Sequence, residues 1–219
     1  MNKRDLIGLK NINTKDYWEK RFRTKNWGKS GNRQTREYAK ANVAQMDLNS
    51  DYDGKILDFG CALGDAIPIY KTSFPQAKLY GIDFSEEAIQ ICKEAYGDIA
   101  EFSSGNHQKV NKQEVVIASH VMEHITDDKQ IVKQILSQCK ALYVFVPFKE
   151  NPLYREHVNY YEEDYYADLN VEQKKIFLVH FNYRYAPIEA VKSFLKGKFT
   201  LTGSFKKEII MYKIKGSIS

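Results

Sequence analysis

The hydrophobic residues of this chain follow two patterns, and the change between them comes near residue 55. Residues 1–50 are mostly polar and favour two helices, over Lys15–Arg23 and Gln34–Met46. From residue 55 onward, short apolar runs alternate with amphipathic stretches, which is typical of β-α-β units around a mostly parallel sheet. The five runs are KILDF (55–59), KLYGID (78–83), Ile99–Phe102, EVVIAS (114–119) and ALYVFV (141–146).

Two of the segments between these runs have clear helical spacing. Residues 86–96 place their apolar side chains on one face, and Ser85 can cap that helix. The predicted apolar face consists of Ala88, Ile91, Cys92 and Ala95. Residues 128–138 repeat the spacing, so we expect this second helix to begin after His124.

The last third of the chain is less regular. Residues 150–185 are rich in tyrosine, and a helix is predicted over Pro187–Lys196. The stretches KFTLTGSF (198–205) and EIIMYKIK (208–215) read as two final strands. Two strands so close together indicate an antiparallel addition to the sheet.

Composition and charge restrict the class of protein. The 219 residues are 43% hydrophobic and 28% charged, as in ordinary soluble globular chains. No apolar run approaches the roughly 18 residues of a membrane span, and the start lacks an apolar signal segment, so a cytoplasmic location is expected. The three scattered cysteines suit a reduced compartment. The net charge of +5 is dispersed, which disfavours a nucleic-acid partner.

The stretch KILDFGCALGDA (55–66) is the most informative, because a strand, a glycine loop and a helix start follow one another. A dinucleotide loop requires G-x-G-x-x-G, and those positions hold Gly60, Ala62 and Asp65. Asp65 would put negative charge where a pyrophosphate sits, and no G-K-[ST] follows the loop. The loop, between Asp58 and Asp65, better suits a cationic ligand without phosphate, and S-adenosyl-L-methionine fits.

A second acidic residue lies at the end of the next predicted strand. Asp83 follows Gly64 by 19 positions, about the separation at which a carboxylate reaches the ribose of a bound nucleoside. The alternative is that Asp83 only starts the following helix beside Ser85. Its place at a strand end favours the ribose role.

Three stretches in this order, LDFGCALGD, GIDFSEEAI and VVIASHVMEHITD, resemble the core of class I S-adenosylmethionine-dependent methyltransferases. The resemblance is to the small-molecule branch, which includes ubiquinone-biosynthesis and sugar or surface-glycan enzymes, and it covers roughly residues 55–147. It implies a Rossmann-like, doubly wound α/β fold with a seven-stranded, mostly parallel sheet and an antiparallel C-terminal strand. The family pattern has glycine where this chain has Ala62.

The resemblance also implies roles for single residues. Asp83 would hold the ribose and Phe84 would lie against the adenine. The full cofactor-binding set would be Asp58, Gly60, Cys61, Ala62, Gly64, Asp83, Phe84, Ser104, Gly105, Ser119 and His120. Residues 1–50 are expected to form a helical lid, or a plain packing helix, over a methyltransferase domain at 51–219 with an acceptor-side insertion around 150–186.

The hexapeptide SHVMEH (119–124) contains H-x-x-E-H, the pattern of one class of zinc peptidases. A zinc site would need both histidines on one helical face and a third protein ligand. Because the helix is expected to start after His124, and a strand leads into the motif, we expect no metal. His120 should face the methyl-transfer zone, with Glu123 and His124 in structural roles.

Methyl transfer to a hydroxyl or ammonium acceptor requires removal of a proton, and a histidine is the natural base near neutral pH. The candidates, in order, are His120, His157 and His124. The resemblance also places the His-aromatic segment after the fifth strand near the acceptor. Acceptor contacts are therefore expected from Arg155, His157 and Tyr160, while the neighbouring tyrosines pack over the sheet.

The expected function is transfer of a methyl group from S-adenosyl-L-methionine to an oxygen or nitrogen of a small molecule, such as a sugar, a phosphorylated compound or a surface-glycan precursor. Two alternatives stay open. An RNA methyltransferase predicts RNA binding that falls steeply with salt. A non-catalytic cofactor-binding protein predicts binding without turnover and indifference to His120→Ala and His157→Ala.

Overall fold

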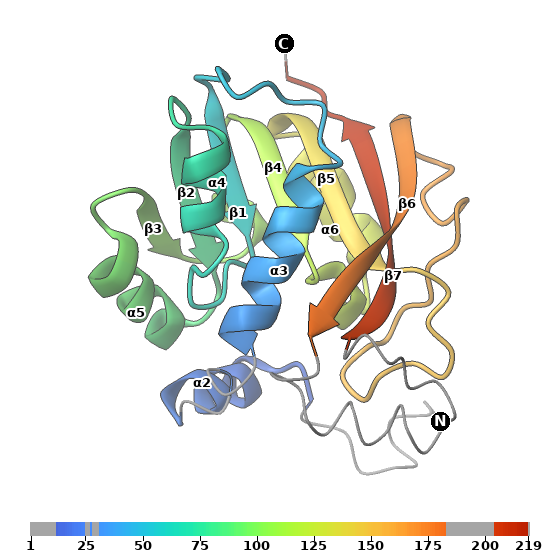
Figure 1. Cartoon of the computed structure of the whole chain (residues 1–219), viewed down its shortest axis with the longest axis horizontal. Helices are drawn as coiled ribbons and strands as arrows, with labels where there is room; N and C mark the ends of the chain where they lie inside the picture. Colours follow the sequence, from blue (N-terminus) through green and yellow to red (C-terminus); the bar gives the residue numbers. More distant parts are fainter. Residues whose placement is uncertain (1–11, 25–26, 28–30, 183–203, 219) are drawn as a thin grey trace.

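A computed structural model describes residues 12–24, 27, 31–182 and 204–218. Their strands form one seven-stranded sheet in the order β3-β2-β1-β4-β5-β7-β6 (Figure 1). The strands are β1 (Lys55–Phe59), β2 (Lys78–Asp83), β3 (Glu101–Ser104), β4 (Gln113–Ser119), β5 (Cys139–Pro147), β6 (Val171–Asn182) and β7 (Ser204–Lys215).

Only the last strand runs against the others. The pairs β3-β2, β2-β1, β1-β4 and β4-β5 are all parallel. Strand β7 is antiparallel to both of its neighbours, β5 and β6. The predicted mostly parallel sheet with an antiparallel C-terminal strand is confirmed.

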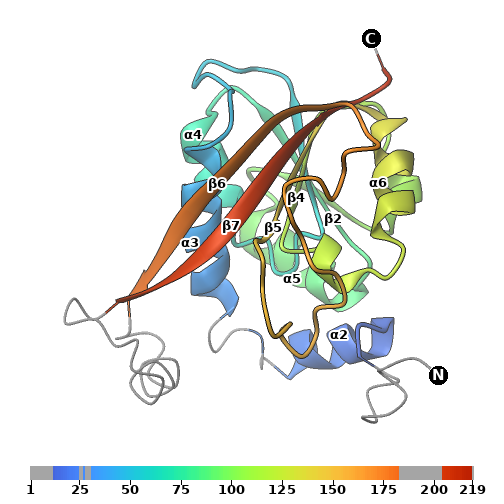
Figure 2. The same cartoon turned by 90° about the vertical axis from the view of Figure 1, so that its right-hand side faces the viewer.

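Helices cover both faces of the sheet, which makes the three-layer arrangement of a doubly wound fold (Figure 2). On one face lie α3 (Gly31–Val43) and α4 (Ile67–Ser73), with α5 (Glu86–Tyr96) along β2 and β3. The opposite face is covered by α6 (Asp128–Leu136) and by the tyrosine-rich segment after β5. Helix α2 (Lys15–Arg23) lies apart from both layers, at one end of the sheet. None of the described helices is long and apolar enough to cross a membrane.

Several elements have the predicted bounds, namely α2, β1, β2 and α5. The Ser85 Oγ accepts the Ala88 N–H at 3.1 Å, so the predicted cap of α5 is present. The predicted apolar face of α5 is wrong in one position. Ala95 is exposed, whereas Ile89 is buried next to Ala88 and Cys92.

Helices α3 and α4 start at other residues than predicted. The former begins at Gly31 and ends at Val43, because the Gln45 and Met46 N–H groups donate to the Asn42 carbonyl in a closing turn. The latter begins at Ile67, just after the stretch 55–66 in which its start was expected, because two tight turns separate it from the glycine loop.

Strand β3 occupies Glu101–Ser104 and not Ile99–Phe102. The N–H groups of Ile99 and Ala100 both donate to the Tyr96 carbonyl at 3.1 Å. They therefore close the end of α5, and the strand can start only after them.

The strand predicted to pair with the last strand is wrong, because β7 pairs with β6 where residues 198–205 were expected. Strand β6 lies within the stretch that was expected to be irregular, and it pairs along its length with β7. Its inner face includes Gln173 and Lys175, while Ile176 and Leu178 on its outer face are 44% and 45% exposed. Because polar residues point inward and apolar ones outward, the sequence shows no clear alternation. The predicted helix 187–196 and most of 198–205 lie outside the described residues.

Candidate active site

The glycine loop after β1 is attached to the end of β2 by backbone hydrogen bonds. The Gly60 and Cys61 N–H groups donate to the Ile82 carbonyl at 2.7 and 3.0 Å. The Ala62 N–H donates to the Asp83 Oδ2 at 3.0 Å. The loop and the β2 carboxylate therefore form one unit at the carboxyl edge of the sheet, where ligands bind in open α/β folds.

Backbone geometry explains the glycines of this loop. Gly60 and Gly64 have φ angles of +75° and +76°, which residues with a side chain rarely adopt. A Cβ at Gly60 would also lie 2.3 Å from the Val121 Cγ2, so the loop touches the segment after β4. Ala62 has a φ of +48°, and it therefore holds a strained conformation in which the family pattern has glycine.

Two buried carboxylates stand side by side at this edge. Asp58 is 4% exposed and Asp83 is 5% exposed. Burial and the nearby charge of Asp83 raise the pKa of Asp58 to about 7, and burial raises the pKa of Asp83 to about 6. No ion pair reaches either carboxylate from the described residues. A cationic ligand fits such a pair, as the sulfonium and α-ammonium of S-adenosylmethionine would.

Asp65 does not have the role that we expected from the sequence. Its carboxylate forms an ion pair with Arg36 at 2.9 Å and accepts a hydrogen bond from Tyr96 at 3.4 Å. The charge that was expected to repel a pyrophosphate is therefore neutralised by α3. The preference for a cationic ligand depends instead on Asp58 and Asp83.

The residues expected near the adenine lie next to Asp83. The Gly105 N–H donates to the Asp83 carbonyl at 2.9 Å, which brings the loop after β3 against the end of β2. The Phe84 ring is 38% exposed and free to stack. The Ser104 carbonyl accepts a hydrogen bond from Lys109. Cys61 is buried, so only its backbone lines the loop.

Side chains of α3 contact the end of β4. The Asn42 side-chain amide donates to the Ser119 Oγ at 2.9 Å. The Tyr38 ring packs on the His120 ring with 3.7 Å between centroids. His120 has a φ of +55°, so the chain turns sharply at this residue.

His120 and Glu123 form a pair in which the carboxylate is buried and the imidazole is partly buried. The His120 Nδ1 lies 3.0 Å from the Glu123 Oε1, and Glu123 is 1% exposed. Burial acts to raise the pKa of Glu123, but the hydrogen bond from His120 and the nearby histidine charges bring it down to about 2. The His120 Nε2 and the Glu123 Oε2 are buried without a hydrogen-bond partner among the described residues.

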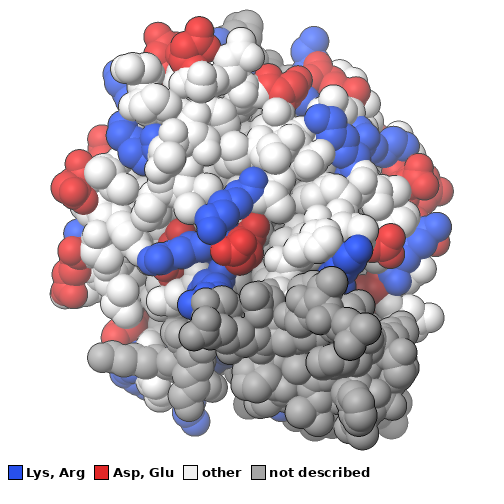
Figure 3. Space-filling model, in the orientation of Figure 1, with Lys and Arg blue, Asp and Glu red and all other residues white. Residues whose placement is uncertain are grey.

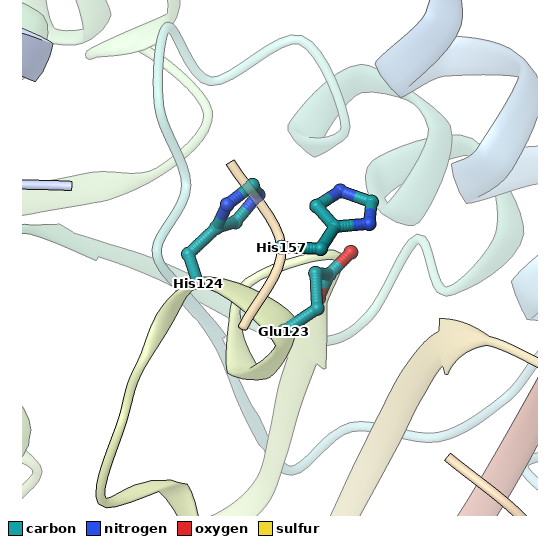
Figure 4. A group of neighbouring side chains, drawn as sticks. All are labelled: Glu123, His124 and His157. Carbon is teal, nitrogen blue, oxygen red and sulfur yellow. The ribbon is translucent and has the colours of Figure 1, made fainter. Parts of the chain in front are cut away.

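The other two candidate histidines lie beside this pair. His124 and Glu123 belong to the short 3-10 helix η3 (Met122–His124), and His157 follows β5. The His124 and His157 rings are 5.0 Å apart, and Figure 4 shows the Glu123 carboxylate directed at His157 with His124 beside them. The structure therefore gathers all three candidate bases around Glu123. Burial lowers the pKa of His124.

Helix α2 packs on the site from outside. Trp18 and Phe22 contact Leu63 of the glycine loop and Ala88 of α5. The Trp18 ring also meets the His124 ring edge-on at 5.3 Å. This helix therefore bridges the cofactor loop and the histidine cluster, as expected of a covering element.

The acceptor candidates Arg155 and Tyr160 are exposed on the segment that carries His157. The neighbouring tyrosines are structural, as predicted. The hydroxyls of Tyr161, Tyr165 and Tyr166 all donate to the Asp128 carboxylate at 2.6–3.0 Å.

Sequence reasoning missed four side chains that hold the site together. They are Asn13, Tyr38, Asn42 and Glu150. Three of them lie more than 70 positions from the residue that they contact, so no local pattern marks them. Glu150 is the exception, because it precedes its partner His157 by seven positions.

Comparisons with known proteins agree with this geometry. The sequence model of a family described as "Methyltransferase domain" matches residues 32–173. No curated protein sequence is significantly similar to the chain.

Solved structures share the fold at low sequence identity. A Haloferax volcanii protein described as a methyltransferase, in complex with the Trm112 methyltransferase activator, has a TM-score of 0.63 at 13% identity, over 93% of this chain and 98% of that one. The plantazolicin methyltransferase BpumL, in complex with S-adenosylhomocysteine, has a TM-score of 0.58 at 14% identity over 92% and 91%. The [4+2]-cyclase SpnF has a TM-score of 0.60 at 12% identity over 86% and 81%.

The match of the family covers well over half of the chain, and it includes β1 to β5 and the whole cofactor edge. The structural likeness extends the same fold over the remaining strands. The chain belongs to the class I S-adenosylmethionine-dependent methyltransferases.

Proposed function

We propose that this enzyme methylates a hydroxyl oxygen of a small molecule, with His120 as the general base. The observation that carries the proposal is the His120-Glu123 pair. Because the Glu123 carboxylate accepts from the His120 Nδ1–H, the neutral imidazole has its lone pair on Nε2. That nitrogen is buried and has no partner among the described residues.

At the carboxyl edge of the sheet, one group of residues would hold the cofactor and another would act on the acceptor. When bound, S-adenosylmethionine supplies an electrophilic methyl group on a sulfonium. Asp58 and Asp83 would hold its cationic and ribose parts, and Phe84 its adenine. In the second group, His120 would take the acceptor proton, held in place by Tyr38 and Glu123.

Helix α2 would keep water from the reacting atoms, which strengthens the electrostatic interactions inside a site. The supporting contacts are those of Trp18 and Phe22 with the glycine loop. Residues 12–24 would then act as the cover of the site, consistent with the lid expected from the sequence.

The charge distribution supports a small acceptor better than RNA. Over the described residues of the face drawn in Figure 3, Lys and Arg are interspersed with Asp and Glu and do not form a stripe. A nucleic-acid footprint would need a concentrated basic surface.

Two variants test the proposal. Calorimetry should show S-adenosylmethionine binding in the wild type and in His120→Ala, and its loss in Asp83→Ala. With methyl-labelled cofactor and the low-molecular-mass fraction of a cell extract, His120→Ala should transfer label about 10²–10⁴-fold more slowly than the wild type. His107→Ala, in the 3-10 helix η2 (His107–Lys109), is the matched control and should be unchanged.

Three results would contradict the proposal. Label transferred only to the RNA fraction would indicate an RNA methyltransferase. Cofactor binding without any transfer would indicate a non-catalytic protein. Full activity of His120→Ala would remove His120 from the chemistry.

A further inference from the structure

The cluster beside the proposed base has the composition of a metal centre. Glu123, His124 and His157 each offer a ligand atom, and these atoms all lie within 4.8 Å of one another (Figure 4). The sequence predicted no metal site, because the helix was expected to start after His124 and a strand leads into H-x-x-E-H. The fold supplies a third ligand from the segment after β5, 33 positions beyond His124.

Each of the three side chains is already oriented by a second partner. The His124 Nδ1 lies 3.2 Å from the Glu156 carbonyl, and the His157 Nδ1 bonds to the Glu150 carboxylate. The Glu123 Oε1 is held by His120. Metal-binding histidines usually have one ring nitrogen fixed in this way, which leaves the other nitrogen for the ion.

The free oxygen of Glu123 points to a cation. The Glu123 side chain is 1% exposed, and its Oε2 has no hydrogen-bond partner within the described part of the chain. A buried carboxylate oxygen without a partner is costly, and such oxygens are usually paired or coordinate a metal. Two imidazoles and this oxygen therefore converge on one unsatisfied position.

The backbones that carry the ligands are tied together. The Asn13 side-chain amide donates to the carbonyls of both His124 and Glu156, at 3.0 and 2.6 Å. Glu156 immediately precedes His157, so one amide fixes the two ligand-bearing segments relative to each other. A site on two segments needs such a connection to keep its geometry.

We propose that Glu123, His124 and His157 bind a divalent transition-metal ion. Two imidazoles and one carboxylate suit ions from Mn²⁺ to Zn²⁺, whereas Mg²⁺ and Ca²⁺ prefer oxygen ligands alone. Three protein ligands leave coordination positions open, as in catalytic and not structural sites. The ligand atoms, which lie within 4.8 Å of one another, must close by up to about 1.4 Å to reach the roughly 3.4 Å separations of bound centres.

The open positions define an acceptor class, and this step rests on the proposed function. A hydroxyl that coordinates the ion has a lowered pKa. Its O–H bond breaks with the proton passing to the His120 Nε2, and the oxygen forms a bond to the methyl carbon. The sulfur–methyl bond breaks with its electron pair left on sulfur. The acceptor is therefore a hydroxyl compound that can coordinate a metal through the reacting oxygen.

Metal binding is tested on the full chain, purified without a histidine tag. Equilibrium dialysis against Zn²⁺, Mn²⁺ or Mg²⁺ should give one equivalent of Zn²⁺ or Mn²⁺ and no tight Mg²⁺. His157→Ala and His124→Ala should weaken binding by about 100-fold or more, and Glu150→Gln by about 10-fold. His180→Ala, an exposed histidine of β6, is the matched control and should bind as the wild type does.

A spectroscopic measurement makes the test independent of activity. Co²⁺ should give a visible absorption spectrum in the wild type and in His180→Ala that is lost in His157→Ala. Because an alanine variant can unfold, the test is repeated with Glu123→Gln and His157→Gln, which replace the ligand with a side chain of similar size. Loss of the spectrum in these variants while S-adenosylmethionine still binds supports the site.

The metal proposal and the proposed function fail in different ways. No stoichiometric ion in the wild type, or equal binding by wild type and His157→Gln, overturns the metal site and leaves cofactor binding untouched. One equivalent of Mg²⁺ in place of Zn²⁺ or Mn²⁺ overturns the choice of ion. Metal binding without S-adenosylmethionine binding overturns the proposed function alone.

Discussion

Gly60 illustrates how single residues set the shape of the cofactor edge. Its positive φ and the closeness of Val121 leave no room for a side chain. Ala62, two residues later, also has a positive φ, but its side chain is accommodated there. The loop therefore has one position that demands glycine and one that only prefers it.

A pair of substitutions tests this difference. Gly60→Ala should destabilise the fold by about 1–3 kcal/mol and abolish cofactor binding, because the loop must move away from Val121. Ala62→Gly should be neutral or stabilise by up to about 1 kcal/mol and keep cofactor binding. Chemical denaturation and calorimetry check both variants. A Gly60→Ala protein as stable as the wild type would contradict the described loop geometry.

Asp58 should make stability depend on pH. Its pKa of about 7 lies above the usual value of 3.8, so the folded state binds more protons than the unfolded state between these values. The contribution is therefore complete below about pH 4 and is lost as the pH rises towards about 7.

The measurement is the free energy of unfolding across this pH range. In the wild type it should fall by an amount on the order of a few kcal/mol as the pH rises. Asp58→Asn should flatten the profile, leave the part due to Asp83, and weaken S-adenosylmethionine binding. Asp53→Asn, an exposed carboxylate just before β1, should keep the wild-type slope. An equally steep profile in Asp58→Asn would exclude Asp58 as its source.

At the scale of elements, α2 is a short helix that side-chain contacts attach to the site. Beyond its aromatic contacts, Lys15 pairs with Glu86 at 3.0 Å, and Tyr17 and Arg21 both bond to Glu156. The helix has only nine residues, so its stability depends on packing. Loss of its buried aromatic residue should release it from the edge.

Trp18→Ala should therefore speed dissociation of S-adenosylmethionine and expose α2 to trypsin, while the sheet stays folded. Removal of a buried tryptophan costs about 3–5 kcal/mol, more than a short helix can lose. Stopped-flow dissociation rates and limited proteolysis measure the two effects. Asp16→Asn, at an exposed position on the same helix, should change neither, and a Trp18→Ala protein with wild-type rates would mean that α2 is not a cover.

A buried carboxylate of α6 binds the segment after β5, beside an exposed ion pair between Lys133 and Asp168 at 2.9 Å. Asp128 is 2% exposed and accepts three tyrosine hydroxyls and the Lys129 N–H. The same segment carries His157 and Glu150, so this network also positions one wall of the proposed metal site.

Asp128→Ala should cost about 3–5 kcal/mol, because it leaves buried hydroxyls without partners. Its neighbour Asp127 is exposed and makes no capping hydrogen bond, so Asp127→Ala should stay within about 0.5 kcal/mol of the wild type. Thermal or urea unfolding distinguishes the two variants. Similar losses for both would indicate that the tyrosine network adds little to stability.

At the scale of the whole molecule, local patterns predicted the parallel sheet and the loop that follows β1. They did so because KILDF and KLYGID are short, mainly apolar runs with an acidic residue at or next to the last position. The pattern failed at β6, where the inward side chains include Gln173 and Lys175. It also failed wherever a site residue depends on a distant partner, as with Asp65 and Arg36 or His120 and Tyr38. Such pairs follow from tertiary packing, which periodicity does not encode.

The position of β7 between β5 and β6 has a consequence for how the chain is made. Strand β6 leaves the ribosome before β7, yet β7 is the one strand paired with it among the residues that the structure describes. Until β7 emerges, β6 has an unpaired backbone on both sides and exposed Ile176 and Leu178, a combination that favours aggregation. The hydrogen bond from Lys175 of β6 to the Gln45 carbonyl, in the turn after α3, must form late as well. The enzyme therefore closes its fold in a late step that joins β6 to β7 and to the turn after α3, and nascent chains are most vulnerable just before it.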